Sequence, residues 1–172
     1  MTVTLISGAM LFTTLFMGYA IYRTSADQWP PLGVGRVSLV LPTVSTLMIL
    51  VSSWFAYQVR LNVKAQSFKE AKTNLNITLG LGLGFMVVQS LLWAYLKNVG
   101  LFASSGIFAS ILYAFTWIHA AHVLCGLGTL VFLRIVMKPE RRHILQTTLN
   151  VEKFWHFLGI VWLVMYFGLF VF

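Results

Sequence analysis

The sequence has few charged residues, and this scarcity argues against a soluble fold. Only 9% of the 172 residues are charged, whereas 59% are hydrophobic. A soluble domain usually carries about 25% charged residues, because its surface must face water. The apolar residues also fall in long runs, as they do in integral membrane proteins. We therefore expect a membrane protein.

Cysteine and acidic residues are also scarce. The one cysteine, Cys125, cannot form an intrachain disulfide, and the chain has no CxxC metal-binding motif. All acidic residues fall in predicted loops or at predicted helix ends: Asp27, Glu70, Glu140 and Glu152. Ion-coupled pumps and transporters usually keep an ionisable group inside the membrane. This chain alone is therefore a poor candidate for a proton pump or a proton channel.

Five apolar runs are long enough to cross a membrane as helices, which takes about 20 residues each. They occupy residues 3–22, 37–59, 75–96, 107–136 and 153–172. No lysine or arginine precedes the first run, as it would in a signal peptide, so we interpret this run as a retained helix. The sequence predicts one all-α membrane domain over residues 1–172, a polytopic transmembrane bundle of five helices with short loops.

The basic residues are distributed unequally between the two ends of this predicted bundle. Nine of the 12 fall at the end that carries the N-terminus and the loops after the second and fourth runs: Arg60, Lys64, Lys69, Lys72, Arg134, Lys138, Arg141, Arg142 and Lys153. Short loops rich in Lys and Arg usually stay in the cytoplasm. We therefore expect a cytoplasmic N-terminus and a C-terminus outside. The net charge of +8 follows from this placement, and we expect no nucleic-acid partner.

Two histidines, His119 and His122, lie three residues apart on one helical face inside the apolar fourth run. Three interpretations are open, namely structural groups, metal ligands, or haem ligands acting together with His156 of the fifth run. Metal ligation needs further carboxylates, thiols or imidazoles, and only His156 is available within the membrane region. We favour the structural interpretation, in which each neutral imidazole hydrogen-bonds to another helix or to lipid.

Small and polar residues in the third run favour helix packing. Gly80 and Gly84 are four residues apart, a spacing that lets two helices approach closely. A nucleotide-binding loop would need a preceding strand, which this stretch lacks. Gln89 is an uncharged hydrogen-bonding residue, suited to the interior of a bundle.

Six short stretches, in order along the chain, resemble subunit III of the haem–copper respiratory oxidases in its five-helix form. They are Met10–Arg23; Trp29-Pro30-Pro31-x-Gly33; Leu41-Pro42 with Ser45-Thr46 and Ser52-Ser53; Leu79-Gly80 with Gln89; Thr116 with His119-x-x-His122-Val123-x-x-Gly126; and Phe154-Trp155-His156-Phe157 with Ile160-Val161-Trp162.

The resemblance implies an accessory subunit of a bacterial inner (plasma) membrane, without a catalytic centre, a metal or a cofactor of its own. Haem and copper would reside in subunits I and II. The subunit would stabilise the catalytic subunit, bind phospholipid and support proton uptake during dioxygen reduction. Packing roles are expected for His119, His122, His156, Trp162, Gln89, Gly80, Gly84 and Gly126. Candidates for contact with lipid headgroups are Trp29, Arg60, Lys64, Arg141 and Arg142.

The chain departs from this family at Gly8, Leu92 and Gly159, where an intramembrane carboxylate is usual. Functions of those carboxylates therefore do not transfer to this chain. Two alternatives stay open at this point. One is an accessory subunit of a nitric oxide reductase, and the other is a membrane electron carrier with haem held by His119 or His122 and His156. The electron donor, cytochrome c or quinol, is also open.

Overall fold

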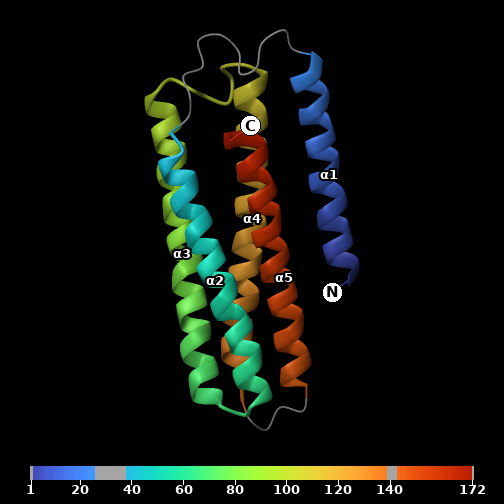
Figure 1. The fold of residues 1–172 in the computed structure, drawn as a ribbon, viewed down its shortest axis with the longest axis vertical. Coiled ribbons are helices and arrows are strands. Elements are labelled where there is room, and N and C mark those ends of the chain that lie inside the picture. The colour runs from blue at the N-terminus through green and yellow to red at the C-terminus, as the bar shows by residue number, and fades with distance from the viewer. Residues whose placement is uncertain (1, 26–37, 139–142, 172) are drawn as a thin grey trace.

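Five long helices make up the computed structural model, which describes residues 2–25, 38–138 and 143–171. They are α1 (Thr2–Ser25), α2 (Val40–Lys64), α3 (Phe68–Asn98), α4 (Ile107–Val136) and α5 (Ile144–Met165), which continues as a π-helix, η1 (Tyr166–Val171) (Figure 1). The described residues contain no strand. Each of the five helices is long and apolar enough to cross a membrane. The predicted all-α bundle of five transmembrane helices is confirmed.

Two helices begin earlier than the apolar runs predicted. α3 begins at Phe68 rather than at residue 75, and α5 begins at Ile144 rather than at residue 153. The added turns of α5 are amphipathic, since Thr148 and Val151 are buried whereas Leu145 faces outward. A search for continuous apolar runs misses such turns, because buried and exposed positions alternate along them.

Residues near the helix ends suit their positions. Pro42 lies in the first turn of α2, where its missing N–H would have had no intrahelical partner. Gly100 and Gly106, with φ angles of 79° and 134°, allow the turn between α3 and α4. Basic residues in the last helical turns interact favourably with the partial negative charge at the C-terminal ends of the helices: Arg23, Lys64, Lys97 and Arg134.

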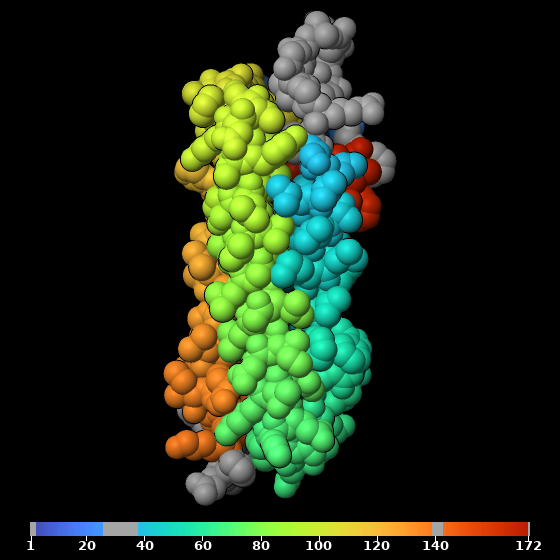
Figure 2. Space-filling view, turned by 90° about the vertical axis from the view of Figure 1, so that its left-hand side faces the viewer, coloured from blue at the N-terminus to red at the C-terminus, as the bar shows by residue number. Residues whose placement is uncertain are grey.

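Helices α2 to α5 run antiparallel to one another in order, and α1 stands beside them against α4 and α5 (Figure 1). α2 and α3 lie side by side along most of their length (Figure 2). α1 buries only a narrow line of residues, which includes Gly8, Phe12 and Tyr19. The Tyr19 hydroxyl donates to the carbonyl oxygen of Gly168 in η1 at 2.6 Å. This bond joins the C-terminal half of α1 to η1.

Glycine makes room for a tryptophan in the centre of the bundle. Trp155 of α5 is fully buried, and a Cβ atom at Gly82 or Gly126 would lie 2.8 or 3.1 Å from its ring. A Cβ at Gly84 would collide with the side chain of Met48. At Gly80, in contrast, a Cβ would meet no atom within 4 Å. Within the described residues, Gly82 therefore makes the close helix approach that was expected of Gly80.

Candidate functional site

Three tryptophan indoles donate hydrogen bonds to hydroxyl groups on neighbouring helices. The pairs are Trp155 with Ser52 and Trp162 with Thr46 between α5 and α2, and Trp93 with Thr116 between α3 and α4, at N···O distances of 3.0, 3.0 and 3.1 Å. Each such bond contributes about 0.5–1.5 kcal/mol to the stability of the fold. Trp162, expected to pack between helices, is completely buried and joins α5 to α2.

An ion pair joins α2 to α5 nearer the other end of the bundle. Arg60 Nε lies 2.8 Å from Glu152 Oε2 and donates to Oε1 at 3.1 Å. His156 Nε2, one turn further along α5, lies 3.5 Å from Glu152 Oε1. The guanidinium of Arg60 also lies 4.7 Å from the centre of the Tyr57 ring, at cation–π distance. The side chain of Glu152 is only 8% exposed, whereas that of Arg60 is 31% exposed.

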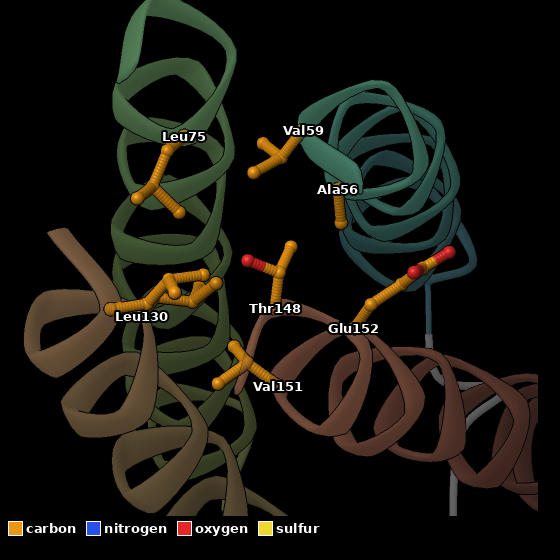
Figure 3. A pocket seen from close by; sticks show the side chains of 8 residues that line it. Ala56, Val59, Leu75, Leu130, Thr148, Val151 and Glu152 are labelled. Carbon is orange, nitrogen blue, oxygen red and sulfur yellow. The ribbon is translucent and has the colours of Figure 1, made fainter. Parts of the chain in front are cut away.

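The position of Glu152 corrects the sequence analysis, which placed every acidic residue in a loop or at a helix end. Because α5 begins at Ile144, Glu152 lies more than two turns inside this helix. It borders a small cavity lined mainly by apolar side chains of α2 to α5, and its carboxylate points away from Leu75 and Leu130 (Figure 3). A buried carboxylate is costly unless a cation compensates it, and Arg60 is that cation.

His119 lies in an aromatic shell in the middle of α4. Its ring centroid is 6.1 Å from that of Phe12, 6.0 Å from that of Phe85 and 5.5 Å from that of Trp162. The side chain is buried, and neither ring nitrogen has a hydrogen-bond partner among the described residues. The expected hydrogen bond from His119 to another helix is therefore not found.

The other two candidate histidines make contacts that the sequence did not predict. His122 Nδ1 lies 2.8 Å from the carbonyl oxygen of Ile118, so it bonds to its own helix and not to a neighbouring one. His156 lies against Glu152. Within the described residues, no group of three His, Cys, Asp or Glu side chains is placed to hold a metal ion.

The three positions where the related family usually has a carboxylate hold residues that pack closely against their neighbours. Leu92 is completely buried. A Cβ at Gly8 would lie 3.1 Å from the Phe157 ring, and one at Gly159 would lie 3.3 Å from Ser53 Oγ. A longer side chain at either glycine would therefore displace its neighbour.

The structure describes two of the five residues that are expected to contact lipid headgroups. Lys64 is exposed in the last turn of α2, as expected for such a contact. Arg60 contacts Glu152 but keeps part of its side chain exposed. Trp29, Arg141 and Arg142 lie outside the described residues.

Sequence reasoning missed the pairing of Arg60 with Glu152. The available signal was one basic residue near the end of the second run and one acidic residue before the fifth. Connecting the two required the knowledge that α2 and α5 are neighbours.

Comparison with known proteins gives a consistent result along the chain. The family model described as cytochrome c oxidase subunit III matches residues 1–172. Cytochrome c oxidase subunit 3 of Thermostichus vulcanus is 29% identical, over 94% of this chain and 80% of that protein. Probable cytochrome c oxidase subunit 3 of Nocardia farcinica is 32% identical, over 91% and 78%. Cytochrome bo(3) ubiquinol oxidase subunit 3 of Buchnera aphidicola is 28% identical, over 94% and 84%.

Proposed function

Because the chain belongs to the cytochrome c oxidase subunit III family, we propose that it is an accessory subunit that stabilises the catalytic subunit of a haem–copper terminal oxidase. Haem and copper are held by partner subunits I and II, where dioxygen is reduced. This chain has no catalytic centre of its own. It takes part in the complex through packing and through contacts with lipid.

The observation that carries this proposal is the apolar outer surface of the five helices, together with the family match over the whole chain. Large apolar side chains are exposed on every helix, for example Ile6, Trp54, Leu83, Trp117 and Ile160. Such a surface is covered either by lipid tails or by the helices of a partner. α1 is the most exposed helix, because it buries only a narrow line against α4 and α5.

The proposed membrane is the bacterial inner membrane, with the N-terminus in the cytoplasm. The α2–α3 connection and the start of α5 lie at the same end of the bundle (Figure 1). The described basic residues of that end are Arg60, Lys64, Lys69, Lys72, Arg134, Lys138 and Lys153. They suit anionic phospholipid headgroups of the cytoplasmic leaflet. The supporting role in proton uptake, which the family membership suggests, would belong to the same side.

The accessory role is tested by removing the chain from the oxidase. Cells that lack the chain should still assemble a complex with the full haem spectrum, but this complex should lose activity faster on incubation in detergent. The rate of proton uptake by the chain-free complex, measured separately, tests the supporting role at the inner surface. Absence of haem from the chain-free complex, at normal levels of subunits I and II, would contradict the proposal.

The orientation is tested with reporter fusions. A reporter that is active only in the cytoplasm should work when it is fused at residue 1 and should fail when it follows Phe172. The opposite pattern would overturn the proposed topology, although not the family assignment.

A further inference from the structure

Three fully buried polar side chains in the bundle lack hydrogen-bond partners among the described residues. They are Ser45 on α2, Gln89 on α3 and His119 on α4, each no more than 1% exposed. The atoms concerned are the Ser45 hydroxyl oxygen, the oxygen and nitrogen of the Gln89 amide, and both ring nitrogens of His119. Each comes from a different helix.

Gln89 and His119 lie at the same level of the bundle. Gln89 is midway between Phe85 and Trp93, which stand one turn before and one turn after it on the same face of α3. The Phe85 ring contacts His119, and the Trp93 indole donates to Thr116, one turn before His119 on α4. We therefore infer that Gln89 faces α4 at a height between those of Thr116 and His119.

Ser45 stands apart from this pair. It lies on α2, which packs mainly against α3 and α5. It precedes Thr46, which accepts the hydrogen bond from the Trp162 indole of α5. Gln89 and His119 are thus the unpartnered pair on the neighbouring helices α3 and α4.

Leaving these atoms without partners would be costly. A buried donor or acceptor without a hydrogen bond costs about 1–3 kcal/mol. A direct bond between His119 and Gln89 would use one atom of each residue and would leave the other atoms unpaired. A water molecule can both donate and accept, and buried waters typically make about three hydrogen bonds to such groups. Neutral imidazole and amide groups likewise each offer a donor and an acceptor.

We propose that Gln89 and His119 form a water-binding site in which ordered water bridges α3 and α4. The histidine is then connected to the neighbouring helix through water, rather than through a direct side-chain contact. The site lies within the chain itself, so it forms whichever partner subunits cover the outer surface.

A cryo-EM map of the complete oxidase complex, at a resolution that shows ordered water, tests the site directly. We expect a density peak at hydrogen-bond distance, roughly 2.7–3.2 Å, from a His119 ring nitrogen and from the Gln89 amide. A direct His119–Gln89 contact would overturn the proposal. So would a map that shows ordered water elsewhere in the bundle but none at this site.

Paired substitutions test the bridge in solution. In a water-bridged site, His119→Phe and Gln89→Leu each leave the other group and the water poorly paired, so each should shorten the retention half-time of the subunit in detergent. The double variant should then be no worse than the more damaging single variant. Multiplicative shortening in the double variant would contradict the proposal.

Thr148→Val provides the matched control for this cycle. Thr148 is buried but donates to the carbonyl oxygen of Ile144 in its own helix, well away from the site. Its effect should multiply with that of His119→Phe, because distant sites act independently. If the His119 variants do not assemble, the Gln89→Leu complex still gives a map, in which the bridging density should be lost and the Trp162–Thr46 contact kept. Persistence of the density there would count against the site.

Discussion

Replacing Arg60 with leucine removes the cation that lies against the buried carboxylate of Glu152. An exposed ion pair is worth about 0–1 kcal/mol, whereas removing one partner of a fully buried pair costs about 3–5 kcal/mol. Glu152 is almost fully buried but Arg60 is 31% exposed, so this pair lies between the two cases. We expect Arg60→Leu to destabilise the bundle by about 2–3 kcal/mol.

Equilibrium unfolding of the purified subunit in detergent or bicelles measures this loss. A change of this size lowers the folded-to-unfolded ratio roughly 30-fold or more, because every 1.4 kcal/mol is a factor of ten. Lys64→Leu is the matched control, since it removes an exposed cation one turn further along the same helix. A second leucine, at Glu152, should restore most of the stability to the Arg60 variant, because no unpaired charge then remains buried.

Chemical labelling gives an independent readout of the same change. Carbodiimide reagents attack protonated carboxyl groups in apolar surroundings. We expect no labelling of Glu152 in the native subunit, where Arg60 lies against its carboxylate, and clear labelling in Arg60→Leu, where this contact is lost. The reasoning would be refuted if Arg60→Leu were as mild as Lys64→Leu, or if the double Arg60/Glu152 variant were less stable than Arg60→Leu alone.

Three further substitutions test the packing and the role of the second histidine. Gly82→Ala should lower the free energy of unfolding by about 1–3 kcal/mol, because the added methyl group overpacks against Trp155. Gly80→Ala should leave the stability unchanged or raise it slightly. Equal effects of the two variants in thermal denaturation would contradict the close approach at Gly82. Trp155→Phe should cost about 1–3 kcal/mol through the lost bond to Ser52 and the lost volume, whereas the same change at exposed Trp54 should cost much less. His122→Ala should leave the optical haem spectrum of the complex unchanged, and loss of one haem would favour the electron-carrier alternative.

The number and type of the helices were predictable from the sequence, because the requirement for an apolar span of about 20 residues does not depend on which helices are neighbours. The start of α5 was not predictable in this way. Its first turns contain Gln146 and Asn150, which break the apolar run, although Thr148 and Val151 on the opposite face are buried. Only packing against the other helices distinguishes these turns from a loop.

The buried polar contacts were predictable only in part. The sequence indicated that Gln89 and Trp162 belong in the bundle interior, and both are buried there. It did not indicate that Trp162 bonds to Thr46 or that Arg60 pairs with Glu152, because both contacts join residues far apart in the chain. The predicted interhelical bond of His119 has no partner among the described residues, for another reason. The helices that pack around it present Phe12, Phe85 and Trp162, which offer its ring nitrogens no hydrogen bond.

The central claim is that the chain supports an oxidase without holding its redox cofactors, and optical spectroscopy tests it most directly. The purified complex would be separated in detergent into this chain and the remaining subunits, and the haem and copper content of each fraction would be measured. The account predicts that the remaining subunits retain all the haem and copper and that the isolated chain shows no Soret band. A stoichiometric Soret band in the isolated chain, lost on replacing His119 or His156, would contradict it.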